Sequence, residues 1–393
     1  MKKVFITFII FFIVFGIIIG IFNIPFIKER LKSISNMIFI EQIEEYTDDF
    51  EINKLKVSNQ SFYYNKLSDE QKRIYTCIAN GVKKLDEVFL LQNYNIVDND
   101  TTMTDIEKSM QAFFADHPEV FYVDNKYTVS TKHTFFNDYV EIYLTYSVSN
   151  LSELEVRISE IEGKIEQYLA QVSDKELFNA ELVLHDLLGK NVEYYDYEDL
   201  ESVPQECHTI YGAFINNKAV CDGFTKALQI LLDRKNIENI IVLGNLEKES
   251  HAWNMVKLEN EWYHVDLTSD KSIKDMNSSI VLHTYFNVTT EQIEKTHTIE
   301  NKEIIPSAIQ TKYNYYLYTG KNIIVADDFN TKFKQILDEN DNEYLVEFGV
   351  SGVTSVAEKM VDFLSGNRYQ DYVANNKITY YSLLDSYVLV KNK

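Results

Sequence analysis

Three segments decide the expected fold: AVCDGF at residues 219–224, HAWN at residues 251–254 and WYHVD at residues 262–266. A thiol, an imidazole and a carboxylate appear in this order along the chain. Each lies in a local pattern that predicts a defined position, at a helix start or on a strand. These side chains are therefore the first candidates for a functional site.

Cys221 is expected at the start of a helix. Apolar residues follow it at helical spacing, at Phe224, Ala227, Leu228, Leu231 and Leu232. The unpaired N–H groups and the dipole of a helix N-terminus favour the thiolate, which is the reactive form of cysteine. Gly223 leaves room for a close approach at the first turn. The charge of Asp222 opposes a thiolate, so its side chain is expected to point away from the sulfur.

The other two segments predict a β-hairpin. Its strands are residues 251–258 and 262–268, and both have β-rich composition. A two-residue turn at residues 259–260 pairs Leu258 with Glu261. This register determines which side chains share a face of the sheet, because side chains alternate along a strand.

In this register Asp266 faces Trp253, and His251 faces Thr268. His251 and Asp266 are then diagonal neighbours on one face. A carboxylate in that position can orient an imidazole and stabilise its protonated form, while the second ring nitrogen serves a thiol. The pattern therefore predicts a cysteine–histidine–aspartate triad.

The stretch resembles the bacterial form of the transglutaminase-like (papain-like thiol enzyme) superfamily over about residues 175–300. The matching motifs are Tyr211-Gly212-Ala213, Val220 to Phe224, His251 to Asn254, Trp262 to Asp266, and Tyr285-Phe286-Asn287-Val288 followed by His297. The resemblance implies Cys221 as nucleophile, His251 as general base and acid, and Asp266 as the orienting carboxylate. Asp222 stands where a glutamate is common in the family.

The composition limits the classes of function. The chain has 393 residues, 45% hydrophobic and 13% aromatic, which suffices for a substantial core. Its net charge of −22 argues against a nucleic-acid partner, because phosphate binding needs a basic surface. Its three cysteines do not form a disulfide framework, and Cys77 is interpreted as a buried small apolar residue.

The N-terminus predicts a membrane anchor. The 24 residues from Val4 to Ile27 carry no charge, which is enough to span a bilayer. Lys2 and Lys3 favour a cytoplasmic N-terminus, although basic residues after the run compete with them. We therefore expect a single-pass protein of the cell membrane whose catalytic domain is extracellular.

The predicted fold class is α+β: a papain-like or transglutaminase-like core with an N-terminal transmembrane helix and flanking α+β regions. The expected divisions are a signal-anchor at 1–27, a linker at 28–60, an N-terminal α+β domain at 61–150, a catalytic domain at 151–300 and a C-terminal α+β extension at 301–393. Helices are expected from the Ser68 capping box to about Leu91 and at 104–115, 151–172, 174–190, 331–337 and 353–364. Strands are expected at 120–123, 127–130, 139–148 and 378–390.

Other constellations have less support. Cys207, His208, His264 and Asp266 are zinc-ligand types, but they lack the spacing of known zinc motifs, and His264 could instead support Asp266 from the same strand face. No motif supports a serine triad or a calcium loop. His185 is interpreted as structural, with a place in the active-site wall as the alternative. No metal or other cofactor is expected.

The sequence thus predicts a membrane-anchored extracytoplasmic thiol enzyme. It would act on amide bonds by acyl transfer or by hydrolysis. The expected substrate is a peptide or protein, such as a cell-wall peptide or a surface protein. Cys221 would form the acyl-enzyme, and an amine or water would resolve it. The alternative is a transglutaminase-like module without catalysis that binds or scaffolds at the cell surface.

Overall fold

The computed structural model describes residues 62–92, 99–133, 138–197, 202–271, 281–324, 327–340, 345–366, 370 and 378–391. The expected membrane anchor at residues 1–27 and the linker at 28–60 lie outside these residues. Within the described ranges, no helix combines the length and apolar character needed to cross a bilayer. The described chain forms two compact units, residues 62–114 with 122–155, and residues 115–121 with 156–391.

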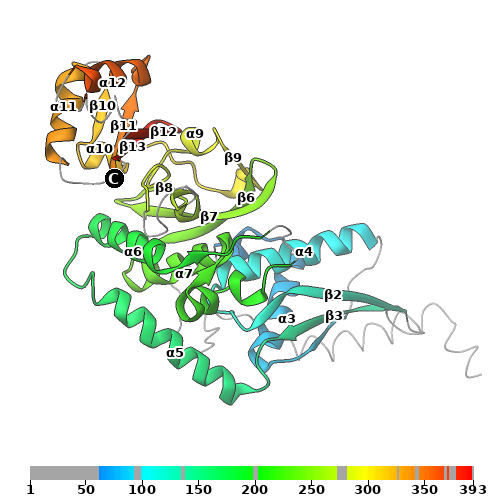
Figure 1. Cartoon of the computed structure of the whole chain (residues 1–393). Helices are drawn as coiled ribbons and strands as arrows, with labels where there is room; N and C mark the ends of the chain where they lie inside the picture. Colours follow the sequence, from blue (N-terminus) through cyan, green and yellow to red (C-terminus); the bar gives the residue numbers. More distant parts are fainter. Residues whose placement is uncertain are drawn as a thin grey trace, which may run out of the picture. The chain divides into compact units, whose positions relative to one another are not determined.

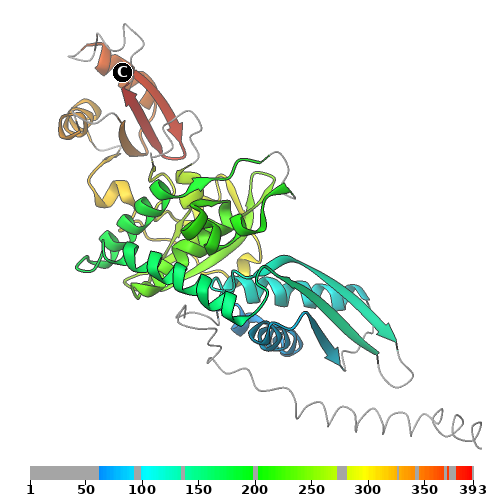
Figure 2. The same ribbon diagram turned by 60° about the horizontal axis from the view of Figure 1, so that its bottom comes forward.

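The first unit combines two helices with a three-stranded antiparallel sheet. Its elements are α3 (Asp69–Lys84), β1 (Val88–Gln92), α4 (Asn99–Asp116), β2 (Val123–His133) and β3 (Asp138–Tyr146). The strand order is β1-β3-β2, and the long β2–β3 hairpin is the blue-green pair in Figure 2. The strand expected to begin at Val120 begins at Val123, because the preceding residues form a turn.

Helix α3 shows both a confirmed start and a corrected end. Ser68 and Gln71 form the predicted capping box, with each side chain accepting a hydrogen bond from the other residue's N–H. The helix ends at Lys84 and does not continue to Leu91. Leu85 adopts the left-handed conformation with φ of 57°, which closes the helix before β1.

The second unit contains the stretch around Cys221. Three helices, α5 (Leu151–Leu169), α6 (Leu177–Asn191) and α7 (Cys221–Arg234), accompany an antiparallel sheet of order β8-β7-β6-β9 (Figure 1). The strands are β6 (Asn239–Leu246), β7 (Glu249–Leu258), β8 (Glu261–Val265) and β9 (His297–Ile299). Leu151, expected in the buried stripe of α5, is exposed, whereas the five apolar positions predicted on α7 are fully buried.

The shorter elements of this unit connect the helices to the sheet. They are the two-residue strands β4 (Glu193–Tyr194) and β5 (Lys218–Ala219), the helices α8 (Leu267–Asp270), α9 (Thr290–Ile293) and α10 (Tyr315–Tyr318), and the turns η3 (Gln205–His208), η4 (Gly212–Asn216) and η5 (Lys302–Ile304). β4 and β5 are parallel, and β5 leads directly into α7. This arrangement fixes the residue at which α7 begins.

The C-terminal part of the second unit has its own sheet of order β10-β11-β13-β12. The elements are β10 (Asn322–Ile324), α11 (Phe329–Glu339), β11 (Leu345–Ser351), α12 (Val356–Ser365), β12 (Ile378–Leu383) and β13 (Ser386–Lys391). Phe333 of α11, Met360 of α12 and Phe348 of β11 share one core, with both helices beside the sheet in Figure 1. The strands predicted at 378–390 are confirmed, and they pair as the antiparallel hairpin β12–β13.

Candidate active site

Cys221 is the first residue of α7, as predicted. Val220 precedes it in extended conformation and offers no side-chain cap, so the first N–H groups of the helix are available near the sulfur. A side chain at Gly223 would place its Cβ 2.4 Å from the carbonyl oxygen of Cys207. Glycine therefore lets the first turn of α7 pack tightly, and the partly exposed thiol lies at the positive end of the helix dipole.

The predicted hairpin register is confirmed, because Leu258 pairs with Glu261. Both turn residues, Glu259 and Asn260, have positive φ, as a two-residue turn of this kind requires. The expectation that His251 faces Thr268 is wrong. Strand β8 ends at Val265, and the chain then turns into α8, so Thr268 has left the sheet.

Asp266 is the residue at which this turn occurs, and it serves two elements. Its Oδ1 accepts a hydrogen bond from Ser269 N at 3.1 Å, which caps α8. Its Oδ2 accepts a hydrogen bond from His251 Nε2 at 2.9 Å. The Ser269 hydroxyl also donates to Oδ2. Asp266 is 1% exposed, so these contacts hold its carboxylate in one orientation.

Electrostatics keep His251 and Asp266 as an ion pair. Burial disfavours the charged ring of His251, but the charge and hydrogen bond of Asp266 outweigh it, and the neighbouring Cys221 thiol adds to the effect of Asp266. Together these raise the pKa of His251 to about 10. Burial likewise disfavours the carboxylate of Asp266, yet His251 and His297 bring its pKa well below the usual range. Because Nε2 of His251 bonds Asp266, Nδ1 remains for the thiol.

Asp222 does not point away from the sulfur, contrary to expectation. Its Oδ1 lies 3.8 Å from Cys221 Sγ. His208 Nδ1 donates to the same carboxylate, at 3.1 Å to Oδ1 and 3.0 Å to Oδ2. Burial opposes ionisation of Asp222, but the contact with His208 and the charge of Lys226 bring its pKa below the usual value. The carboxylate beside the thiol is thus paired by His208, a contact that local spacing did not predict.

His297, on β9, is a residue of the site for which the sequence predicted no role. Its Nε2 lies 3.0 Å from Asp266 Oδ2, the same oxygen that His251 contacts. The ring packs against Trp253, with centroids 5.0 Å apart. The sequence showed His297 only as part of a family motif, because its approach to Asp266 depends on the order of the strands.

The four residues considered as zinc ligands, Cys207, His208, His264 and Asp266, do not form one cluster in the structure. His264 Nδ1 accepts from Trp253 Nε1 at 3.0 Å, and its Nε2 contacts Thr290 Oγ1 at 3.2 Å, so it does not support Asp266 directly. Among the described residues, the groups with metal-ligand types close together are His251–Asp266–His297 and His185–Asp186–His283. Neither group includes Cys207 or His208.

The second of these groups lies in a buried chain of alternating acids and imidazoles. His185 contacts Asp186 at 3.2 Å and Asp270 at 3.3 Å, and His283 contacts Asp186 at 2.9 Å. His283 Nδ1 also contacts Glu347 at 2.5 Å. Each of the four ring nitrogens of His185 and His283 has a carboxylate nearby. These residues therefore form a charge network, and no metal ion is needed to explain why they lie together. His185 hydrogen-bonds to none of Cys221, His251 and Asp266, in keeping with its structural interpretation.

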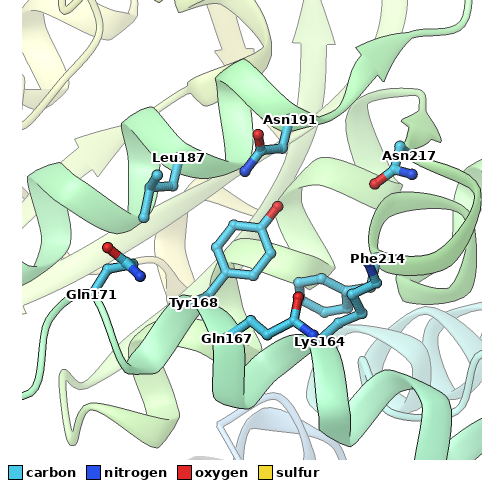
Figure 3. A pocket seen from close by; sticks show the side chains of 8 residues that line it. All are labelled: Lys164, Gln167, Tyr168, Gln171, Leu187, Asn191, Phe214 and Asn217. Carbon is cyan, nitrogen blue, oxygen red and sulfur yellow. The ribbon is translucent and has the colours of Figure 1, made fainter.

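A cavity of about 370 Å³ lies between α5, α6 and the turn before β5. Its lining is Lys164, Gln167, Tyr168, Gln171, Leu187, Asn191, Phe214 and Asn217. Figure 3 shows Tyr168 between the helices with its hydroxyl directed toward Asn191. None of the three candidate catalytic residues lines this cavity, so it is separate from the thiol.

Comparison with known proteins gives weak but consistent similarities. No protein-family model and no curated protein matches the chain. Three solved structures show a distant similarity. A transglutaminase shares 11% identity and a TM-score of 0.28 over 61% of this chain and 59% of its own. A candidate cysteine protease from Cytophaga hutchinsonii shares 11% identity and a TM-score of 0.24 over 37% of this chain and 66% of its own.

The periplasmic domain of TgpA from Pseudomonas aeruginosa shares 13% identity and a TM-score of 0.22, over 36% of this chain and 62% of its own. The match thus spans less than two thirds of each of these three structures. At such low TM-scores these structures say nothing about the chemistry of the site, which rests on its own geometry.

Proposed function

We propose that this protein is a thiol enzyme of the transglutaminase-like kind that transfers or hydrolyses acyl groups at amide bonds. The observation that carries the proposal is the position of His251, whose Nε2 bonds Asp266 at 2.9 Å and whose pKa is raised in part by the Cys221 thiol. A nucleophile, a base within reach and a group that orients the base are the elements of nucleophilic catalysis. Cys221 is the nucleophile, His251 the proton carrier and Asp266 the orienting carboxylate.

The reaction follows from these roles. The Cys221 thiolate attacks the carbonyl carbon of a carboxamide or peptide bond, and the Cys221 backbone N–H donates to the developing oxyanion. The carbon–nitrogen bond then breaks, the leaving amine takes the proton from His251, and a thioester on Cys221 remains. An amine or water attacks the thioester while His251 takes its proton, and the carbon–sulfur bond breaks to restore the thiolate. An amine gives a cross-link, and water gives hydrolysis.

The test is direct detection of the thioester. The protein is incubated with glutamine-containing and cell-wall-type peptides, and intact-mass and peptide mass spectrometry look for an acyl adduct on Cys221. Cys221→Ala should show no adduct and no turnover while keeping its fold, whereas Cys77→Ala should behave like the wild type. A Cys221→Ala protein that retains turnover would refute the thiol mechanism. Peptide binding without any adduct in the wild type would favour the binding-module alternative.

We also propose that the protein is anchored in the cell membrane with this unit outside the cell. The support is the uncharged run from Val4 to Ile27 and the preceding Lys2 and Lys3. The full-length protein should then stay in the membrane fraction at high salt and be released by detergent. Protease added to intact cells should remove the region after about residue 35. Release by salt, or protection from the protease, would contradict anchoring or orientation respectively.

A further inference from the structure

Asp266 receives two imidazoles on one oxygen. Nε2 of His251 lies 2.9 Å from Oδ2, and Nε2 of His297 lies 3.0 Å from the same atom. The two rings are 5.4 Å apart between centroids, and both are nearly fully buried. The triad proposed above uses only one of these histidines, so the second needs its own account.

The hydrogen bonds determine how His297 is protonated. An ionised carboxylate only accepts hydrogen bonds, so Nε2 of His297 must carry the proton that it donates to Asp266. Nδ1 of His297 lies 2.9 Å from the hydroxyl oxygen of Thr296, which also lies 3.4 Å from the carbonyl oxygen of Ile293. The contact with Asp266 thus places a proton on Nε2 of His297. The Thr296 hydroxyl holds the other ring nitrogen and so helps to keep the ring in the orientation in which it supports Asp266.

The order of strands explains how His297 reaches this position. Asp266 follows β8, His251 is on β7 and His297 is on β9, so β6 lies between the two histidines. Gly244 of β6 faces His251 on one side and Ile299 on the other. A Cβ at Gly244 would lie 2.0 Å from Thr298 O and 2.9 Å from the Trp253 ring. The absence of a side chain there lets β9 and the Trp253 ring come close together on this face.

We propose that His297 is a positioning residue of the thiol site, which holds Asp266 ionised and correctly oriented while His251 gains and loses its proton. The inference rests on the proposed thiol chemistry. When His251 gives its proton to the leaving amine, the ion pair with Asp266 disappears for that step. The buried carboxylate would then favour taking up a proton, but His297 and Ser269 continue to donate to it. Asp266 therefore stays an acceptor, and His251 keeps its ring orientation for the next transfer.

The test uses His297→Leu, which removes the donor, and His297→Gln, whose amide N–H can still donate. His264→Leu is the matched control, because it removes an equally buried imidazole that hydrogen-bonds to none of the triad. The first readout is the pH dependence of Cys221 alkylation, which needs no substrate. Without the hydrogen bond from His297, Asp266 becomes a stronger acceptor for His251 and raises the pKa of His251. The step in the alkylation profile that reports His251 should therefore move to higher pH in His297→Leu. It should return toward the wild-type position in His297→Gln and stay there in His264→Leu.

The second readout is turnover. His297→Leu should lower kcat about 10- to 100-fold with little change in KM, the usual cost of removing a group that orients a reactive one. If His297→Leu does not fold, Thr296→Val removes only the hydroxyl that holds Nδ1 of His297 and should give a smaller shift in the same direction. A wild-type pH profile in folded His297→Leu or Thr296→Val would refute the positioning role. A profile that His251→Ala also leaves unchanged would instead refute the thiol mechanism itself.

Discussion

Two regions of this molecule place a pair of histidines on a single carboxylate oxygen. In the candidate active site, His251 and His297 share Oδ2 of Asp266. In the second network, His185 and His283 share Oδ1 of Asp186. Both sets of rings are buried, and the pKa of both His251 and His283 is raised to about 10, since neighbouring acids outweigh the effect of burial. By residue type and charge alone the two regions look alike.

The difference lies in the remaining ring nitrogens. In the second network they meet further acids, Asp270 for His185 and Glu347 for His283. In the active site they face neutral groups instead of further acids, the Cys221 thiol for His251 and the Thr296 hydroxyl for His297. An imidazole held by carboxylates on both sides retains its protons and contributes to stability. An imidazole between a carboxylate and a thiol can move a proton, so the second partner separates a structural histidine from a catalytic one.

The largest expected effect is on turnover, and it should appear only in the active-site region. His251→Ala removes the proton carrier and should lower kcat/KM by at least about 10³-fold. Asp266→Asn should keep the fold and lose much of the rate. The Cys221→Ala/His251→Ala double variant should be scarcely worse than either single variant, because members of one catalytic unit are not additive. The measurement is steady-state kinetics on a substrate found by the adduct experiment.

The control for this effect is His283→Leu, which removes a histidine of similar burial from the second network. Its turnover per folded molecule should stay close to that of the wild type. A loss of turnover comparable to that of His251→Ala would show that the second network takes part in the chemistry.

The next effect is on stability, and it should be larger in the second network. His283→Leu removes the charged partner of the buried Glu347 carboxylate, which keeps only the hydrogen bonds from the Tyr316 hydroxyl and the backbone N–H of residue 283, and should lower the free energy of unfolding by about 3 kcal/mol. The double variant His283→Leu/Glu347→Gln should recover part of this loss, since no uncompensated charge remains. Denaturant unfolding with a constant m-value would measure both. If the double variant is as unstable as the single one, packing rather than charge accounts for the loss.

These two regions also show how far the sequence could predict the structure. The start of α7 at Cys221 and the pairing of Leu258 with Glu261 follow from local patterns, apolar spacing in one case and a two-residue turn in the other. The approach of His297 to Asp266 depends on β9 pairing with β6, which no local pattern specifies. The same holds for Glu347, which lies 64 residues beyond His283, on β11 of the C-terminal sheet.

The pH dependence of stability tests whether the two regions are electrostatically alike. A histidine whose pKa rises from 6.5 to about 10 on folding contributes its full stabilisation below pH 6.5 and loses it as the pH rises toward 10. Each region should therefore lose on the order of 1 kcal/mol per pH unit above pH 6.5. Denaturant unfolding between pH 6 and 9 should show this decline, and both Asp266→Asn and Glu347→Gln should make it shallower. A variant with the wild-type slope would show that its histidine is not charged in the folded state.

The smallest effect is a difference in cysteine reactivity, and it isolates the thiol that distinguishes the two regions. Cys221 is partly exposed at the start of α7, and its thiol is one of the groups that raise the pKa of His251. Burial and the charge of Asp86 raise the pKa of Cys77 to about 11, and burial raises the pKa of Cys207. Iodoacetamide at pH 7 should therefore label Cys221 about tenfold faster than the other two, as measured by peptide mass spectrometry. His251→Ala should remove this advantage and folded His283→Leu should keep it, because only the first histidine is electrostatically coupled to the thiol. Equal labelling of all three cysteines in the wild type would mean that Cys221 is not activated.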